Sequence, residues 1–261
     1  MIEGRAIRRA VILSAGKGSR LLPLTEDRPK CLIDFSGRTL LEWQLDALEA
    51  AGVARVDIVT GFKPDMVDEV IAGRSGVSTI FNPFYHVADN LGSVWMARRS
   101  FDEDLLLLNG DTLVPPDLVA RVIAAPAAPI RVTIDEKEDY DDDDMKVLRD
   151  GDRLVRIGKK LPTGGYNAES IGVLRFQGEG RRAFIDAVEA IMRTPAGTAD
   201  FYLRVIDLLA DTGIVHTTSI RGIAWQEVDF PPDVEAARAL TAGWARDLAP
   251  GGGPFRAQPR A

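Results

Sequence analysis

The sequence of 261 residues has a single cysteine, Cys31, only two histidines, and no apolar stretch of membrane-spanning length. One cysteine excludes an intramolecular disulfide and argues against a thiolate metal site. It suits a reducing compartment, so we expect a cytoplasmic protein. A membrane span needs about 18 apolar residues, which the chain lacks, so we expect no membrane partner. The basic N-terminus precedes an apolar run of only about five residues, which is too short for the core of a signal peptide.

A surplus of basic residues is also missing. Lys and Arg total 32 and Asp and Glu total 39, which gives a net charge of −7. A general nucleic-acid-binding protein needs a basic face that displaces counterions, so we expect no nucleic-acid partner. The chain is 46% hydrophobic and 27% charged, which is typical of a globular protein, and its length suits one large α/β domain.

Short apolar runs alternate with helical patterns in the first half of the chain. The run at 10–14 is short and continuously apolar and stops at a glycine. This pattern is typical of a strand buried on both faces. Leu41, Leu45 and Leu48 have helical spacing, and Gly52 follows as a stop signal. Further strands are expected at 56–60, 77–81 and 105–108, and further helices at 64–72, 93–99 and 116–124. The alternation predicts βαβ units in an α/β fold, with a Rossmann-like three-layer α/β/α arrangement and a mostly parallel mixed sheet.

The alternation changes after about residue 128. Strands are predicted at 130–134, 145–148, 154–157 and 171–176, with short turns between them, and they indicate an antiparallel extension of the sheet. Helices are expected at 181–192, 201–209 and 232–240, and strands at 215–220 and 224–228. No convincing linker divides the chain, so we expect one domain over 1–248. The segment 249–261 is rich in Gly, Pro and Arg, and we expect it to be a disordered tail.

A glycine-containing loop follows the first predicted strand. It lies at the carboxyl end of the sheet, which is the usual ligand crevice of open α/β folds. Free backbone N–H groups in such a loop can hold phosphate oxygens. The spacing fits neither a Walker A loop nor the dinucleotide fingerprint, since the glycine that each requires is absent. A tight turn with two surface cations is the alternative.

The loop and its continuation resemble the signature of the nucleotidyltransferase family that includes sugar-phosphate and choline-phosphate nucleotidyltransferases. The family pattern is a strand, AGxGxR, PLT and PK. The matching residues are Gly16, Gly18, Arg20, Pro23, Leu24, Thr25, Pro29 and Lys30. The resemblance implies that the loop wraps a nucleoside triphosphate, that Arg20 binds its β- and γ-phosphates, and that Lys30 holds the α-phosphate. It implies further nucleotide contacts from Ser14, Ala15, Gly16, Gly18, Ser19 and Gly110.

Three carboxylates are candidates for a metal site. Asp111 follows a strongly buried predicted strand, at the same sheet edge as the loop. Mg²⁺ favours few protein ligands and keeps its water, so one such carboxylate with triphosphate oxygens suffices. Glu227 and Asp229 belong to a segment that looks like the family's late W-x-E-V/I-D motif, whose last carboxylate completes the site. Without the family, Gly110-Asp111 is also compatible with a surface turn.

The segment 82–98 bears on which base is bound. Sugar nucleotidyltransferases usually carry Gln-Pro-x-Gly-Thr-Ala here, and that pattern is absent. The sequence is similar to the choline-phosphate and phosphonate cytidylyltransferase branch, which implies CTP and a small aminated phospho-acceptor. Asn90 and Ser93 are candidate contacts to the base or ribose; the alternative is that Asn90 caps a helix.

The acceptor site is less specific in sequence. Candidate contacts are Lys146 and Lys159 for the acceptor phosphate, Glu169 for an amine or hydroxyl, and Tyr202 and Trp225 for cation–π contact with a quaternary ammonium. Core packing is the alternative for both aromatic residues. Several converging aromatics favour choline, whereas one carboxylate with few aromatics favours a primary amine. The five aspartates of 139–144 taken alone are typical of a solvated loop. The alternative is that one of them pairs with a substrate ammonium.

Together these features predict a Mg²⁺-dependent cytidylyltransferase. An acceptor phosphate or phosphonate oxygen attacks the α-phosphorus of CTP, and pyrophosphate leaves in line. We expect residues 1–128 to bind mainly the nucleotide and residues 129–248 mainly the acceptor, which is phosphocholine or a 2-aminoethylphosphonate-like molecule. The alternatives are a sugar-1-phosphate or inositol-phosphate nucleotidyltransferase and, from a different class, a nucleotide-binding regulatory module. The oligomeric state is not predicted.

Overall fold

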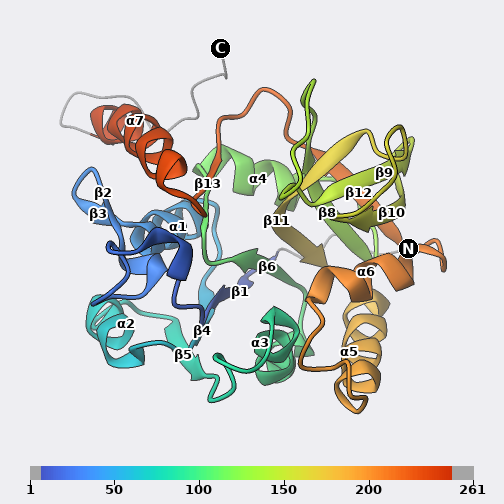
Figure 1. The fold of residues 1–261 in the computed structure, drawn as a ribbon, viewed down its shortest axis with the longest axis horizontal. Helices are drawn as coiled ribbons and strands as arrows, with labels where there is room; N and C mark the ends of the chain where they lie inside the picture. The colour runs from blue at the N-terminus through green and yellow to red at the C-terminus, as the bar shows by residue number, and fades with distance from the viewer. Residues whose placement is uncertain (1–6, 249–261) are drawn as a thin grey trace.

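The computed structural model describes residues 7–248 of the chain, within which one mixed sheet forms the middle layer (Figure 1). Strands from both halves of the sequence join it. In spatial order they are β5 (Val77–Phe81), β4 (Arg55–Thr60), β1 (Arg9–Ser14), β6 (Leu105–Asn109), β11 (Ala168–Phe176), β8 (Ile130–Asp135), β12 (Val215–Ser219), β10 (Arg153–Gly158) and β9 (Lys146–Asp150). The segment 249–261, for which we expect a disordered tail, lies outside the described residues.

The first half of the sheet is parallel, as the alternating sequence pattern predicts. β5, β4, β1 and β6 all run the same way. The side chains of neighbouring residues point to opposite faces, so that Ala10 and Ile12 enter one core and Val11 enters the other. Continuous apolar runs are therefore required, because both faces of these strands are buried.

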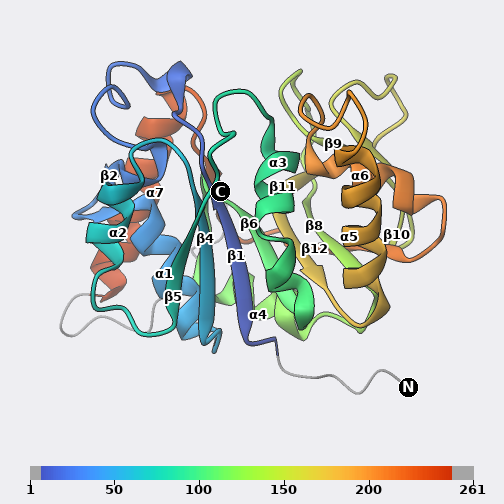
Figure 2. The ribbon, with the colours of Figure 1, turned by 90° about the horizontal axis from the view of Figure 1, so that it is seen from below.

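Helices cover both faces of the sheet (Figures 1 and 2). On one face lie α1 (Leu40–Ala50), α2 (Pro64–Ile71) and α4 (Pro116–Ala124). On the other lie α3 (Asn90–Met96), α5 (Glu179–Met192) and α6 (Tyr202–Ala210). The predicted α/β fold with three layers is confirmed.

The second half of the sheet curls. β11 is antiparallel to both β6 and β8, and β12 is parallel to β8. β9 pairs with β10 and also with the beginning of β11. Because β11 runs against β8, its first residues lie at the same edge as the carboxyl ends of β8 and of the parallel strands. This arrangement brings Glu169 to the edge where the glycine loop lies.

Two short antiparallel ladders stand apart from the main sheet. β2 (Asp34–Phe35) pairs with β3 (Arg38–Thr39), and β7 (Thr112–Leu113) pairs with β13 (Gln226–Glu227). The sequence pattern does not reveal the first, and it predicts a longer strand, 224–228, in place of β13. Two-residue strands have too few residues to show a period. Three 3₁₀ helices, at Ser19–Leu21, Lys30–Leu32 and Arg98–Asp102, were likewise not predicted.

Helix α7 (Pro231–Leu248) extends past the expected end at residue 240 because its later residues have a core of their own. Trp244 is fully buried and packs edge-on against Trp43 of α1, with ring centroids 5.6 Å apart. At the other end of the helix, the Asp233 carboxylate accepts hydrogen bonds from the backbone N–H groups of Asp229 and Phe230, at 2.9 and 2.7 Å. The helix therefore fixes the backbone of Asp229.

Replacing Trp244 by alanine should lower the free energy of unfolding by about 3–5 kcal/mol, because it removes a fully buried aromatic ring and leaves a cavity. Urea denaturation followed by circular dichroism measures the change. Arg246→Ala, an exposed position on the same helix, should change stability by less than about 0.5 kcal/mol. Equal effects from the two substitutions would contradict this account of α7.

Within residues 7–248, no helix combines the length and the apolar character that crossing a membrane requires.

Candidate active site

The glycine loop lies where the carboxyl ends of β1 and β6 meet. The Gly110 N–H donates to the Leu13 carbonyl at 2.9 Å, and the Thr25 hydroxyl closes the loop by donating to the Gly18 carbonyl at 2.7 Å. Gly18 has φ +73°, and a Cβ there would lie 2.8 Å from Cβ of Lys30, so both conformation and space require glycine. The Lys30 side chain thus packs against the loop backbone at Gly18.

A small cavity of about 190 Å³ lies inside this loop. It is lined by Leu13, Ser14, Gly16, Gly18, Lys30, Cys31, Asn90, Asn109, Gly110 and Asp111. Ser14, Gly16, Gly18 and Gly110 were predicted at the nucleotide. Ser19, also predicted there, is exposed at the start of a 3₁₀ helix, outside this lining. Burial raises the pKa of the Cys31 thiol to about 12, so this side chain offers no thiolate at neutral pH.

Gly110 leaves no room for a side chain. A Cβ there would lie 2.2 Å from the Ser14 hydroxyl oxygen and 2.5 Å from the Leu13 carbonyl oxygen. Gly110→Ala should therefore force β1 and β6 apart and lower the free energy of unfolding by about 1–3 kcal/mol, measured by urea denaturation. Gly16→Ala is the matched control, because a Cβ at Gly16 meets no atom within 4 Å. Unchanged stability of Gly110→Ala would show that the strand ends adapt freely.

A carboxylate cluster lies next to the loop. Asp111 lies in the turn between β6 and β7, and the β7–β13 ladder places Glu227 opposite Thr112. The Val228 N–H donates to the Asp111 carbonyl at 3.0 Å. As a result, one carboxylate oxygen from each of Asp111, Glu227 and Asp229 falls within 4.8 Å of the others. The predicted trio is brought together from two distant parts of the chain.

The buried side chain of Gln44 on α1 holds the turn that carries Asp111. Its amide nitrogen donates to the carbonyls of Asn109 and Thr112, at 2.7 and 2.9 Å. The sequence gives no signal for this positioning role, because Gln44 looks like any polar residue on a helix.

Lys30 bridges two of the three carboxylates. Its Nζ lies 2.8 Å from Asp111 Oδ2 and 2.5 Å from Asp229 Oδ1. Burial alone would lower the pKa of the Lys30 ammonium, but Asp111 and Asp229 outweigh it and raise the pKa above the usual value. Lys30 is therefore a permanent cation. Arg20 contributes a second positive charge, with one guanidinium nitrogen 3.3 Å from Asp229 Oδ2 and the group 5.1 Å from the Phe230 ring centroid.

The carboxylates suit a divalent cation. Loss of contact with water and the negative charges of Asp111 and Asp229 raise the pKa of the Glu227 carboxyl to about 8. Such mutual repulsion is the ordinary situation of carboxylates placed to share a metal ion. Oxygen ligands in this number suit Mg²⁺, which keeps its remaining positions for water and phosphate oxygens.

A second cavity, of about 440 Å³, opens beside the loop. It is lined by Leu13, Ala15, Gly16, Tyr85, His86, Val87, Ala88, Asp89, Asn90 and Ser93. The Asn90 side-chain carbonyl accepts a hydrogen bond from the Tyr202 N–H at 2.9 Å, and the Ser93 hydroxyl accepts one from the buried Asn82 amide at 3.1 Å. Both residues thus line the cavity while also holding neighbouring elements.

A third cavity, of about 240 Å³, lies on the far side of the carboxylate cluster, at the edge of the curled half of the sheet. It is lined by Lys137, Asp141, Asp143, Asp144, Glu169, Trp225, Gln226, Glu227, Asp229, Phe230 and Asp233. Seven of these side chains are acidic and one is basic. We name it the acidic pocket.

Two of the predicted acceptor residues lie in the acidic pocket. Glu169 is nearly buried, and burial raises the pKa of its carboxyl to about 7, although Lys137 opposes this shift. The indole N–H of Trp225 donates to Asp135 at 2.8 Å, and the side chain is almost fully buried, so only a little of the ring borders the pocket.

The other predicted acceptor residues lie outside the lining of this pocket. The Lys146 ammonium donates to the backbone carbonyls of Asp141 and Lys159. Lys159 is exposed, 3.2 Å from Asp143. Tyr202 is fully buried, and its hydroxyl donates to Asn109 at 2.9 Å. The geometry does not support the expected cation–π contact from Tyr202, because its ring offers no surface to a ligand.

The sequence reasoning missed Lys137. It lies two residues past the end of β8, and β8 is parallel to β12 and runs toward the site edge. The signal available was its place just past the end of a predicted buried strand, the same signal that identified Asp111.

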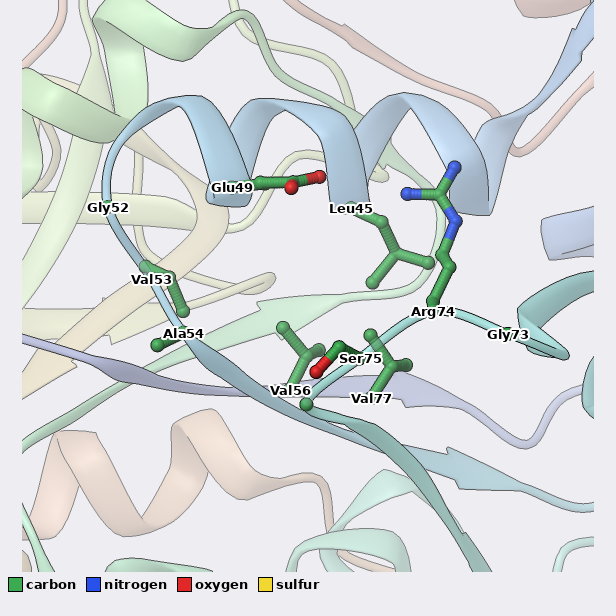
Figure 3. Close-up of a pocket in the computed structure, with 11 residues that line it drawn as sticks. Leu45, Glu49, Gly52, Val53, Ala54, Val56, Gly73, Arg74, Ser75 and Val77 are labelled. Atoms are coloured by element: carbon green, nitrogen blue, oxygen red, sulfur yellow. The ribbon is translucent and has the colours of Figure 1, made fainter.

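A larger cavity, of about 480 Å³, lies at the amino ends of β4 and β5 (Figure 3). Its charged lining residues are Glu49 and Arg74, and Arg74 pairs with Asp46 at 2.9 Å. None of the predicted site residues lines it, and it is at the opposite end of the strands from the glycine loop.

This combination of fold and site defines a nucleotidyltransferase. Residues 10–150 match the family described as the MobA-like NTP transferase domain, and the chain belongs to that family. The predicted resemblance is confirmed.

Several named proteins are similar to this chain in sequence or in fold. CMP-5'-(3-aminopropyl)phosphonate synthase of Streptomyces rubellomurinus is 32% identical over 240 residues, which are 88% of this chain and 38% of that protein. Choline-phosphate cytidylyltransferase of Streptococcus pneumoniae is 32% identical over 35% of this chain and 39% of that protein. The chain therefore spans about two fifths of the length of these curated relatives. The solved inositol-1-phosphate CTP transferase from T. maritima has the same fold, with a TM-score of 0.76 and 24% identity, covering 91% of this chain and 97% of that one.

Proposed function

We propose that this nucleotidyltransferase transfers CMP from CTP to a small phosphonate or phosphate that carries an amine, with Mg²⁺ as cofactor. The observation that supports the proposal most is the acidic pocket beside Asp111, Glu227 and Asp229. A purely anionic acceptor meets seven carboxylates there, whereas an acceptor with a cationic end is attracted. A volume of about 240 Å³ also suits a small molecule, since drug-sized ligands occupy roughly 300–1,000 Å³.

Each part of the site has a role in this reaction. The glycine loop holds the triphosphate through backbone N–H groups, with Arg20 on the β- and γ-phosphates and Lys30 on the α-phosphate. Mg²⁺, when bound to the carboxylate trio, neutralises charge on the phosphate oxygens. An acceptor oxygen forms a bond to the α-phosphorus while the bond from that phosphorus to the bridging oxygen of the β-phosphate breaks. The electron pair leaves with pyrophosphate, and because the attacking oxygen is already anionic, no general base is needed.

The choice of CTP draws on the relatives. Two of them, quoted above, are named for CMP or cytidylyl transfer, and one acts on an aminoalkyl phosphonate by its name. The cavity at Asn90 and Ser93 is the proposed place of the base. The single cysteine supports a reducing location such as the cytoplasm.

The test is pyrophosphate release with Mg²⁺, crossing CTP, UTP, ATP, GTP and dTTP with four acceptors: 2-aminoethylphosphonate, phosphocholine, inositol-1-phosphate and glucose-1-phosphate. We expect release with CTP and an amine-bearing acceptor only. Release with UTP or dTTP and glucose-1-phosphate would instead assign the chain to the sugar branch. Tight nucleotide binding without turnover on any acceptor would indicate a regulatory module.

A further inference from the structure

Three charged side chains form a compact group at the inner end of the acidic pocket. The Lys137 ammonium lies 2.8 Å from Glu169 Oε2 and 2.8 Å from Asp144 Oδ2. The two carboxylates are 6% and 12% exposed, whereas the lysine is 31% exposed. We name the pair Asp144 and Glu169 the ammonium site.

The ammonium site is positioned by the backbone around it. Glu169 is paired with Asp135 of β8 on one side and with Lys146 of β9 on the other. The acidic run of 139–144 is ordered by its own side chains, since the Asp141 carboxylate accepts hydrogen bonds from the N–H groups of Asp143 and Asp144 at 2.9 and 3.1 Å. The Asp141 N–H in turn donates to Asp144 Oδ2 at 2.8 Å. Contacts within the protein itself therefore position both carboxylates.

The geometry requires hydrogen-bond donors. A nitrogen 2.8 Å from two carboxylate oxygens donates an N–H to each, in charge-assisted hydrogen bonds. A quaternary ammonium has no N–H, and its methyl groups hold the nitrogen farther away. Such cations are instead bound by several converging aromatic rings. Around this group, Tyr140 has its ring centroid 5.6 Å from the Lys137 ammonium. The pocket lining adds Phe230 and the almost fully buried Trp225, against seven carboxylates.

From this geometry we infer that the acceptor carries a primary ammonium, and that it binds at Asp144 and Glu169 in the place that the Lys137 ammonium fills in the free protein. The inference rests on the proposed function and narrows its acceptor to a primary aminoalkyl phosphonate or phosphate. Exchange of one ammonium for another keeps the buried charges balanced. The displaced Lys137, as the single cation in the lining of the acidic pocket within residues 7–248, then pairs with the acceptor's phosphonate oxygens.

The first experiment compares acceptors that differ only at the amine. Initial rates of pyrophosphate release are measured with saturating CTP and 2-aminoethylphosphonate, its N,N,N-trimethyl analogue, or ethylphosphonate. We expect kcat/KM for the primary amine to exceed that for either analogue by at least about 100-fold, because a site built to hydrogen-bond N–H groups rejects molecules that lack them. A trimethyl analogue that is used as well as the primary amine would overturn the inference while leaving cytidylyl transfer in place. No CTP-dependent turnover with any acceptor would refute the proposed function itself, and this inference with it.

The second experiment changes the ammonium site. Glu169→Gln and Asp144→Asn keep the side-chain shapes and should each raise KM for 2-aminoethylphosphonate by roughly 10–100-fold, with KM for CTP unchanged. The preference for 2-aminoethylphosphonate over ethylphosphonate should shrink by the same factor, which a merely structural role would not produce. Asp142→Asn is the matched control, since Asp142 belongs to the same loop, is exposed and does not line the pocket. An undiminished preference in both variants would overturn the inference.

Lys137→Met tests whether the substrate amine takes the place of the Lys137 ammonium or binds elsewhere. It removes the internal competitor, so the preference for 2-aminoethylphosphonate over ethylphosphonate should be kept or should rise, even though kcat/KM for both phosphonates falls. A preference that collapses as far as in Glu169→Gln would show that Lys137 does not give way to the substrate amine.

Discussion

Lys30→Met should lower kcat for CMP transfer by about 10³-fold while leaving the fold intact. The ammonium is the cation proposed to neutralise charge on the α-phosphate, and removing one such group from a preorganised site typically costs 10²–10³-fold in rate. Methionine keeps the length of the side chain that packs against Gly18. The measurement is pyrophosphate release under saturating substrates, together with a thermal melt that confirms folding.

Lys63→Met is the control for this prediction. Lys63 is a lysine on a nearby loop whose ammonium donates to the Asp27 backbone carbonyl at 2.7 Å, and it lines none of the cavities described above. Its loss should change kcat less than about threefold, in line with the small effects of surface charges. If Lys30→Met kept a rate within tenfold of the unmodified protein, the charge at the α-phosphate would have to be neutralised by another group.

Asp111→Asn should reduce metal-dependent turnover by roughly 10²–10³-fold, because it removes a charged ligand from the carboxylate trio. It should also weaken the binding of Mn²⁺, used as a probe of the same site, when binding is measured calorimetrically without nucleotide. The two readouts together separate loss of metal from loss of the Lys30 ion pair, which Asp111 also forms at 2.8 Å.

Asp186→Asn provides the comparison for Asp111→Asn, since it removes one carboxylate from the exposed face of α5. It should leave both metal binding and turnover unchanged. Metal-dependent activity that survived in Asp111→Asn would place the cation at other residues.

The sequence predicts most of the fold because its elements are long and either continuously apolar or clearly periodic. The helix 116–124 and the strand 77–81 agree with α4 and β5 residue for residue. The exceptions have physical causes. Helix α7 continues past residue 240 because Trp244 finds a partner in Trp43, a contact that no local pattern contains. The β2–β3 and β7–β13 ladders are too short to show alternation.

The nucleotide and metal half of the candidate site was predictable because its residues belong to recognisable sequence motifs. The resemblance to the nucleotidyltransferase motifs implies that Lys30, Asp111, Glu227 and Asp229 lie together, and they meet in the structure. The acceptor half was less predictable, because the direction of a side chain depends on which strands pair. Lys146 begins β9, opposite Gly158 of β10 and Glu169 of β11, and its ammonium meets backbone carbonyls instead of a ligand. Lys137 was passed over, although its ammonium lies between two carboxylates of the acidic pocket.

The β7–β13 ladder has a consequence for how the protein is made. Lys30 and its partner Asp229 are separated by 199 residues along the chain, and the ladder that brings them together forms only after β13 has left the ribosome. A nascent chain with a complete glycine loop therefore still lacks two of the three carboxylates. We expect incomplete chains that end before β13 to leave the cell's CTP intact, so that synthesis order itself delays the chemistry until the polypeptide can close the site.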